Sequence, residues 1–286
     1  MIAERGHDFM GQIQLIATDL DGTFLMCEDT PHPENVKMVE KCHAHGIRVC
    51  ACSGRPWPAI EKIALEAGLD DFCVTNNGAS VVNIHTGEIR YRNRFDEASM
   101  RKLIEVGLSL HCESVHVAGH KGMHVYNMDG SIETEKPSFM GMEEWNSFHF
   151  YPTLEQMLQA AADDAERVIF GRPQAHGFQE IYDRCNPITP VEVTSTETLY
   201  FVEITPAYGT KAEAIAVLAG IYDCKPENVL ALGDGFNDLH MLLWAGTGVA
   251  MGNADARLKA VADMTTDTNR NAGFAKAVER IVFAGK

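Results

Sequence analysis

"QLIATDLDGT", residues 14–23, joins a short apolar run to two aspartates that stand two positions apart, Asp19 and Asp21. The apolar run predicts a buried strand over residues 14–19. Two like charges this close repel each other and are costly to desolvate, so the pair requires water, a cation or a shared proton. The stretch therefore predicts a buried sheet and a chemically active site at its edge.

Strand and helix patterns alternate on both sides of a long middle segment. Near-continuous apolar strands separated by helices are typical of a parallel sheet that is covered on both faces. The expected strands span residues 14–19, 47–53, 72–76, 229–234 and 248–251. The expected helices span residues 35–46, 56–68, 210–222, 237–245, 254–262 and 271–283.

The middle segment has a different, antiparallel character. Residues 80–93 and 122–135 predict hairpins, the second turning at Asp129–Gly130, and residues 198–205 predict a strand. Helices are expected near residues 96–110 and 153–165. The predicted fold class is α/β, with a parallel-sheet core formed by residues 1–84 and 206–286 and an α+β domain, residues 85–205, inserted into it.

Composition narrows the classes of partner. The formal net charge of the 286 residues is -16, and they contain no cluster of Lys and Arg, which argues against a nucleic-acid partner. The first residues lack the apolar core of a signal peptide, and no apolar run approaches the roughly 18 residues that span a bilayer. Eight cysteines without a Cys-x-x-Cys pair indicate reduced thiols. We expect a cytoplasmic protein without membrane partners, as a monomer or small homo-oligomer.

Polar residues follow four of the predicted parallel strands. They are Asp19, Ser53–Gly54, Asn76–Asn77–Gly78 and Asp234–Gly235. In an open parallel sheet, ligands bind in the crevice at the carboxyl ends of the strands, so these residues are expected to meet. Asp19, Asp21 and Asp234 would then share one crevice with Asp238 close behind, an arrangement that suits Mg²⁺.

Phosphoryl transfer matches the residue types at these positions. Asp19 can attack phosphorus and form an aspartyl phosphate, and Asp21 can protonate the leaving oxygen and then activate water. Ser53 and the amides after it suit a phosphate group. Lys211, at the start of a core helix, can neutralise charge on the transferring group.

Four motifs, "DLDGT", "SGR", the lone Lys211 and "GDGFND", resemble those of the haloacid dehalogenase superfamily. "NNGA" (76–79) and "GVAMGNA" (248–254) resemble its Cof-type phosphatase branch. The resemblance implies a Rossmann-like core with an inserted C2-type cap. It also implies Mg²⁺-dependent hydrolysis of a small phosphorylated metabolite, with sugar phosphates as the leading class.

The resemblance also implies roles for individual residues. Asp19 would be the nucleophile and Asp21 the acid and base, whose backbone carbonyl also binds the metal. Asp234 would complete the metal site, supported by Asn237 and Asp238. Phosphate-binding residues would be Ser53, Gly54, Lys211 and Asn237, and substrate-binding residues Arg55 and Asn77. Two motifs depart from the family pattern: Ala212 follows Lys211 where Gly is common, and "NAGFA" (271–275) lacks the usual acidic residue.

Other hypotheses are compatible with the same residues. A phosphotransferase or phosphomutase would use the same aspartyl phosphate, and a catalytically silent regulator would only bind phosphate. His116, His120 and His124 suggest zinc only weakly, because Gly119 and Gly122 break any helix that would align them. In "SFMGMEEW" (138–145), apolar residues could pack within the insert or line a substrate pocket, and packing is the favoured interpretation.

Overall fold

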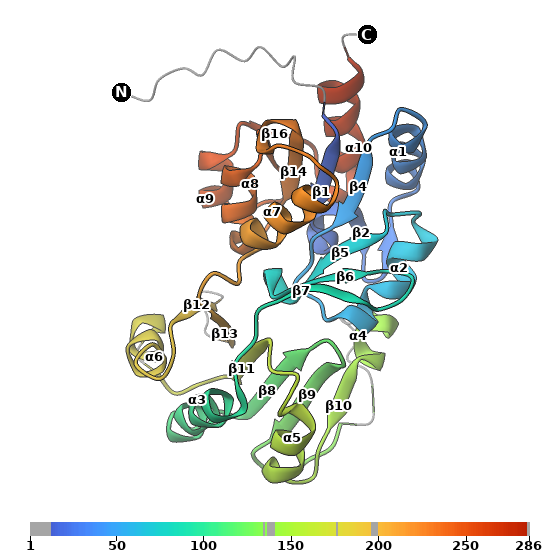
Figure 1. The fold of residues 1–286 in the computed structure, drawn as a ribbon. Helices are drawn as coiled ribbons and strands as arrows, with labels where there is room; N and C mark the ends of the chain where they lie inside the picture. Colours follow the sequence, from blue (N-terminus) through green and yellow to red (C-terminus); the bar gives the residue numbers. More distant parts are fainter. Residues whose placement is uncertain (1–12, 134, 136–140, 176, 196–199, 285–286) are drawn as a thin grey trace, which may run out of the picture.

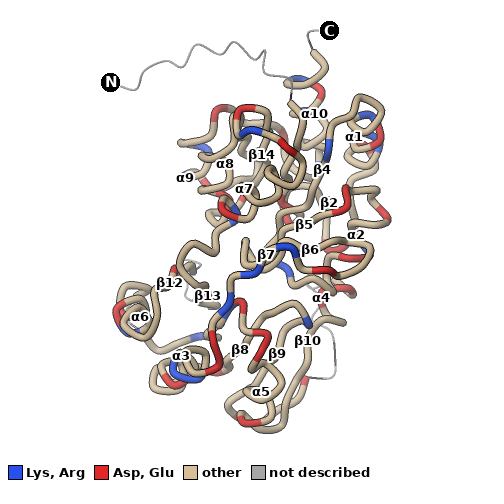
Figure 2. The backbone as a smooth tube through the Cα atoms, viewed as in Figure 1, with Lys and Arg blue, Asp and Glu red and all other residues tan. Residues whose placement is uncertain are grey.

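The computed structural model describes residues 13–133, 135, 141–175, 177–195 and 200–284. Figure 1 shows two bodies that each contain a large sheet, one built from both ends of the described chain and one from its middle. Acidic and basic residues are interspersed over both bodies (Figure 2). Among the described residues, no helix combines the length and the apolar composition that crossing a bilayer requires.

The first body contains a five-stranded parallel sheet in the order β16-β15-β14-β1-β4. Its strands β1, β14 and β15 are buried along their whole length, as expected for a sheet covered on both faces. The order places the ends of β1 and β14 side by side. The strands are β1 (Leu15–Thr18), β4 (Arg48–Ala51), β14 (Val229–Gly233), β15 (Thr247–Ala250) and β16 (Met264–Thr265).

Alternate residues of these strands enter two different apolar clusters. Ile16 and Leu232 pack with residues of α1, α2 and α10, whereas Leu15 and Ala231 pack with residues of α7, α8 and α9. The helical layers therefore lie on opposite faces of the sheet, which confirms the predicted α/β core. These helices are α1 (Pro33–Ala44), α2 (Glu61–Glu66), α7 (Lys211–Ile221), α8 (Leu239–Trp244), α9 (Ala256–Val261) and α10 (Gly273–Val278).

The predicted strand 72–76 forms as β5, but its main pairing is antiparallel rather than parallel. β5 (Phe72–Thr75) pairs antiparallel with β6 (Ser80–Asn83), which pairs in turn with β7 (Ile89–Arg92). Only one parallel bridge, Cys52 to Val74, links β5 to the end of β4 among the described residues. The turn after β5 is tight enough for the chain to fold back at once, so β5 takes its main partner from the predicted hairpin 80–93, which is confirmed. A smaller hairpin joins β2 (Leu25–Cys27) and β3 (Thr30–Pro31).

The middle of the chain forms a six-stranded sheet in the order β10-β9-β8-β11-β13-β12. Its pairs are antiparallel except β9 with β10. Helices α3, α5 and α6 bury their apolar residues against one face of this sheet. The strands are β8 (Ser114–Gly119), β9 (Gly122–Asn127), β10 (Phe148–Phe150), β11 (Arg167–Gly171), β12 (Val191–Ser195) and β13 (Phe201–Pro206). The helices are α3 (Glu97–Ser109), α4 (Met142–Asn146), α5 (Leu154–Ala161) and α6 (Phe178–Cys185).

The predicted hairpin over residues 122–135 is wrong. Its first half is β9, but the partner is the preceding strand β8, and the two meet through a turn at His120 and Lys121. A turn does follow β9, where the Gly130 amide donates to the Asn127 carbonyl at 2.9 Å, but no strand follows it within the described part of residues 130–147. The apolar run 114–119 was overlooked as a strand, although it alternates and ends at a glycine.

The domain limits expected from sequence, at residues 84/85 and 205/206, stay predictions. β7 pairs with β6 and so continues the three-stranded sheet to residue 92. β13 ends the second sheet at Pro206, after which helix α7 begins at Lys211. The eight cysteines are all free thiols, as predicted, and Cys27 is exposed rather than part of the core.

Candidate active site

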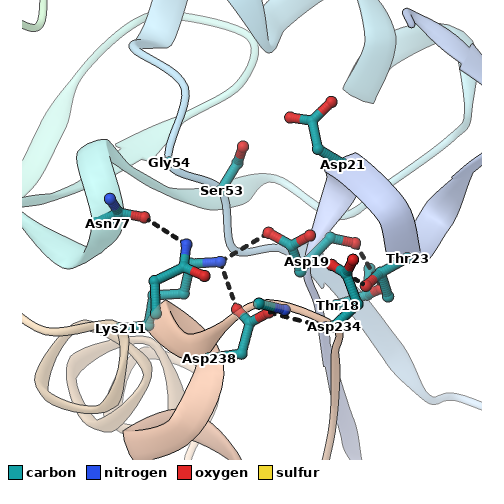
Figure 3. Close-up of polar contacts among 12 residues, drawn as sticks. Thr18, Asp19, Asp21, Thr23, Ser53, Gly54, Asn77, Lys211, Asp234 and Asp238 are labelled. Carbon is teal, nitrogen blue, oxygen red and sulfur yellow. Dashed lines mark hydrogen bonds and ion pairs between the residues drawn. The ribbon is translucent and has the colours of Figure 1, made fainter. Parts of the chain in front are cut away.

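Asp19 lies directly after strand β1, at the carboxyl edge of the parallel sheet (Figure 3). Its backbone amide donates to the Leu232 carbonyl of β14 at 2.9 Å, so the sheet ladder itself places this residue. The side chain is 7% exposed. Burial, together with repulsion from neighbouring aspartates, raises the pKa of Asp19 well above its ordinary value, although Lys211 opposes this shift.

Lys211 is completely buried and links two of the carboxylates. Its Nζ donates to Oδ1 of Asp19 at 2.7 Å and to Oδ1 of Asp238 at 2.6 Å. Burial by itself lowers the pKa of a lysine, but the two carboxylates outweigh this effect and raise the pKa of Lys211. The lysine is therefore a fixed positive charge within the crevice.

Asp238 supports the loop that carries Asp234. Its Oδ1 accepts from Lys211, and its Oδ2 accepts from the backbone amides of Asp234 and Gly235, each at 3.0 Å. Both oxygens of this buried carboxylate are thus engaged by protein donors. The contacts suit a residue that holds the loop and the lysine in place.

Asp19, Asp234 and Asp238 form the one group of potential metal-ligating side chains found among the described residues, with ligand atoms within 4.8 Å of one another. Burial, followed by repulsion from Asp238, raises the pKa of Asp234 to about 6. The single Lys211 cannot neutralise three carboxylates. Oxygen donors with uncompensated negative charge are what Mg²⁺ requires, so these residues fit a divalent cation.

Two further side chains hold Asp234. Thr23 donates from Oγ1 to Oδ1 at 3.3 Å, and Asn253 donates from Nδ2 to Oδ2 at 3.1 Å and to the Gly22 carbonyl at 2.8 Å. Sequence reasoning missed Asn253 as a site residue. The signal was present, because Asn253 follows β15 in the way that the other polar residues follow their strands.

The Asp21 side chain points away from the carboxylate group (Figure 3). It is 55% exposed and accepts from Arg55, whose Nε and Nη2 lie 2.8 and 2.7 Å from its oxygens. Arg55 also donates from Nη1 to Asp29 at 2.6 Å. Burial by itself lowers the pKa of Arg55, but hydrogen bonds and attraction from these carboxylates outweigh it, so the pKa of Arg55 is raised. Arg55 is therefore a permanent cation at the rim.

Ser53 follows β4 and is fully buried, with its Oγ accepting from the Arg55 amide at 3.1 Å. Gly54 lies close to Asn77, and a Cβ there would lie 2.8 Å from Oδ1 of Asn77 and displace that side chain. Asn77 accepts from Nδ2 of Asn237 at 2.9 Å. The predicted phosphate-binding and substrate-binding residues thus lie around the same strand ends as Asp19.

The inserted sheet contacts this edge through two charged residues that sequence reasoning missed. Arg167 of β11 donates to the Gly54 carbonyl at 2.8 Å and to Glu203 of β13 at 2.9 Å, and Glu203 accepts from Asn77 at 2.7 Å. A single sequence carries no signal for such contacts, since they depend on how the two sheets face each other.

A cavity of about 1350 Å³ lies between the two sheets. Asp19, Asp21 and Asp234 line it from the core side, and Arg167 and Glu203 line it from the inserted side. Trp145 of the "SFMGMEEW" segment also lines it, which places this residue in a pocket wall. Met142 is exposed, and Phe139 and Met140 lie outside the described residues.

Fold and site together define a two-part α/β protein with an acidic centre beside a large cavity. The sequence model of the haloacid dehalogenase-like hydrolases matches residues 16–278. The chain belongs to this family, which confirms the resemblance of its motifs.

Relatives that are named as phosphatases match along most of the chain. The 5-amino-6-(5-phospho-D-ribitylamino)uracil phosphatase YcsE of Bacillus subtilis is 28% identical over 276 residues, covering 94% of this chain and 96% of its own. The pyridoxal phosphate phosphatase YbhA of Escherichia coli is 26% identical over 272 residues, covering 89% and 95%. A haloacid dehalogenase-like hydrolase from Bacteroides thetaiotaomicron has a similar structure, with a TM-score of 0.73 at 27% identity and coverage of 94% and 100%. With such relatives, the chain is a phosphatase of this family.

Proposed function

We propose that this phosphatase hydrolyses the phosphate monoester of a small metabolite through a phosphoryl group carried on Asp19. The supporting observation is that Asp19 and Asp234, at adjacent strand ends, meet Lys211, at the start of α7, next to a cavity that can hold a metabolite. Asp19 would attack phosphorus while the bond to the leaving oxygen breaks. Water would then attack the same phosphorus and release Asp19.

Asp21 is the proposed acid and base of these two steps. Its carboxyl group would give a proton to the leaving oxygen in the first step and take one from water in the second. The exposed position of its side chain, at the cavity rim and held by Arg55, allows contact with both substrate and water. Asp19 is too buried, and too firmly held by Lys211, for this role.

Asp19 and Asp234, together with the backbone carbonyl of Asp21, are the proposed ligands of Mg²⁺. When bound, the ion would supply positive charge that lets an anionic phosphate approach an anionic carboxylate. Asp238 is the fourth predicted metal residue, and we propose that it acts by positioning Asp234 and Lys211, because its own oxygens are engaged. Ser53, Gly54, Lys211 and Asn237 are the proposed phosphate-binding residues.

Arg55 and Asn77 are the proposed substrate-binding residues on the core side, with the inserted α+β region, residues 85–205, acting as a cap over the cavity. A cap that closes over the substrate would exclude bulk water and contact the leaving group. Sugar phosphates are the first substrate class to test, in a cytoplasmic enzyme acting as a monomer or small homo-oligomer. The activities named for the two relatives add phosphorylated metabolites that carry a heterocycle.

Phosphate release from a panel of phosphomonoesters, with and without Mg²⁺, tests the proposal. We expect Mg²⁺-dependent release by the wild-type chain and none by Asp19→Asn. Asp71→Asn alters an exposed aspartate that forms a salt bridge with His85 at 3.2 Å, and this variant should keep full activity. Turnover by Asp19→Asn would contradict the mechanism. Incorporation of ¹⁸O from labelled water into the released phosphate distinguishes hydrolysis from transfer to an acceptor sugar.

A further inference from the structure

The inserted sheet has an apolar cluster on each face. The larger cluster joins the sheet to α3, α5 and α6. The smaller cluster contains Met123, Val125 and Ile169, with Phe148 and Phe150 packed against it. These five residues all line the cavity that also contains Asp19 and Asp234. Apolar surface is therefore presented to the space that the substrate would occupy.

Strand register shows how this cavity-facing surface is arranged. In one cross-strand row, Arg167 pairs with Ala118, Ala118 with Met123, and Met123 with Phe148. The row spans three strand spacings, roughly 14 Å in all. It runs from a charged end, where Arg167 contacts Gly54 beside Ser53, to an aromatic end at Phe148. Arg167, Met123 and Phe148 of this row line the cavity.

Three aromatic rings form the aromatic end. The Phe148 ring lies 6.3 Å from the Trp145 ring with 19° between their planes, and 6.3 Å from the Phe150 ring with 29° between them. The Trp145 and Phe150 rings are 5.6 Å apart. All three rings are partly exposed and line the cavity, so within the described part of the chain they form an aromatic surface that faces it.

The cavity wall is thus polar near Ser53 and Gly54 and aromatic farther away, at Trp145, Phe148 and Phe150. A plain sugar phosphate would place hydroxyl groups against the aromatic end and leave them without hydrogen-bond partners there. A planar ring that lies against the aromatic end would instead bury its apolar faces and the aromatic side chains away from water. It would also stack on those side chains.

We propose that the aromatic surface formed by Trp145, Phe148 and Phe150 binds an aromatic or heteroaromatic ring on the leaving group. This inference rests on the proposed phosphatase function. The preferred substrates are then phosphomonoesters in which a short polar segment separates the phosphate from a planar ring. The polar segment lies beside Arg167, Glu203 and Asn77, and the ring lies over β9 and β10.

Matched substrate pairs test the inference. Ribose 5-phosphate and uridine 5′-monophosphate carry the phosphate on the same kind of carbon, and only the second carries a planar heteroaromatic base. We expect kcat/KM for uridine 5′-monophosphate to exceed that for ribose 5-phosphate by about tenfold or more, in line with the strength of ring stacking on aromatic side chains. Pyridoxal 5′-phosphate against glycerol 3-phosphate forms a second pair.

The variant Phe148→Leu/Phe150→Leu keeps apolar side chains but removes the two rings. We expect its preference for uridine 5′-monophosphate over ribose 5-phosphate to fall to within about threefold, as the stacking contribution is lost. This ratio does not depend on how much of the variant is correctly folded. Phe178→Leu is the matched control, because Phe178 is an exposed residue of α6 that does not line the cavity. This variant should keep the wild-type ratio.

Two results would overturn the inference while leaving the phosphatase proposal intact. One is wild-type turnover of the partner without an aromatic ring that equals or exceeds that of the partner with one in both pairs. The other is an equal loss of activity on both members of a pair in the double variant. Failure of the phosphatase proposal has a different signature, because no phosphomonoester would then release phosphate in a manner that depends on Mg²⁺ and Asp19.

Discussion

Lys211 and its two carboxylate partners show how single residues control the site. The lysine is fully buried and bonds to Asp19 and Asp238, which come from the end of one strand and the start of one helix. Removing one partner of a buried ion pair leaves an uncompensated charge and commonly costs about 3–5 kcal/mol. The three residues therefore depend on one another for both stability and charge placement.

Gly22 is required by its backbone conformation and by the close approach of Asp234. Its φ is +75°, and a Cβ would lie 2.2 Å from Oδ2 of Asp234. Gly46 has a similar φ of +73° but open space around the position of a Cβ. We expect Gly22→Ala to abolish phosphate release and Gly46→Ala to cost only about 1 kcal/mol of stability. Activity assays and urea unfolding measure the two effects, and an active Gly22→Ala enzyme would contradict this account of the turn.

His116 predicts a pH dependence of stability. Burial and the nearby Arg167 lower the pKa of His116 to about 4, below the 6.5 of an unperturbed histidine. The unfolded chain therefore binds a proton at this position more readily than the folded chain does. The contribution of neutral His116 to the free energy of unfolding is complete above the unfolded pKa and is lost as the pH falls toward 4. Between pH 7 and pH 5 this residue should account for a loss of about 2 kcal/mol in the free energy of unfolding.

Urea unfolding of the wild-type chain and of His116→Gln at these two pH values measures that loss. The variant should lose correspondingly less stability between pH 7 and pH 5. His45→Gln is the control for removing an exposed imidazole. Equal losses in the wild type and His116→Gln would show that another group dominates.

At the scale of elements, a buried polar network joins β11 to the core strands. Glu166, directly before β11, accepts from Asn76 at 2.7 Å, from Ser80 at 2.8 Å and from Arg92 at 2.7 Å. Arg92 also donates to Asp164 at 2.5 Å. Both acids are almost completely buried. The junction between the two sheets is therefore stabilised by buried ion pairs between Arg92 and the two acids.

Arg92→Met should be strongly destabilising, because it leaves two buried carboxylates without their cation. We expect a loss of about 3–5 kcal/mol in urea unfolding. Arg90→Met in the same strand is the matched control. Arg90 pairs with Glu88 at 3.2 Å on the surface, so its removal should cost less than about 1 kcal/mol. Similar losses in the two variants would contradict a special role for the junction network.

At the scale of the whole molecule, the site joins segments that are far apart in the sequence. Asp19, Lys211 and Asp234 meet only after the ends of β1 and β14 and the start of α7 have come together. An ion that binds this folded arrangement, and not the unfolded chain, must stabilise the whole fold by mass action.

Mg²⁺ should therefore raise the melting temperature. At a hundredfold excess over the dissociation constant, the gain is about 2.7 kcal/mol, which corresponds to a rise of roughly 5 °C or more for a chain of this size. Asp234→Asn should show little or no rise, whereas Asp71→Asn should behave as the wild type does. Differential scanning calorimetry at several Mg²⁺ concentrations provides the measurement. An equal rise in Asp234→Asn would place the ion elsewhere.

Several features could be predicted from the sequence because they depend on local patterns. The strand before Asp19, the helix that begins at Lys211 and the polar residues after β4 and β14 all follow from apolar periodicity and from residues that end an element. The pairing of β5 and β9 could not be predicted in the same way, because an apolar strand does not specify which neighbour it takes.

By itself, the sequence determined the α/β core, the family and the set of acidic residues at the strand ends. Only the tertiary structure decided that Asp238 accepts hydrogen bonds from Lys211 and two backbone amides. It also decided that Asp21 accepts from Arg55. In the same way, it decided that Arg167 and Glu203 contact the core from the inserted sheet. It also decided that Trp145, Phe148 and Phe150 line the cavity. The physical reason is that apolar periodicity acts between neighbouring residues, whereas these contacts join side chains whose separation is set by the packing of two sheets.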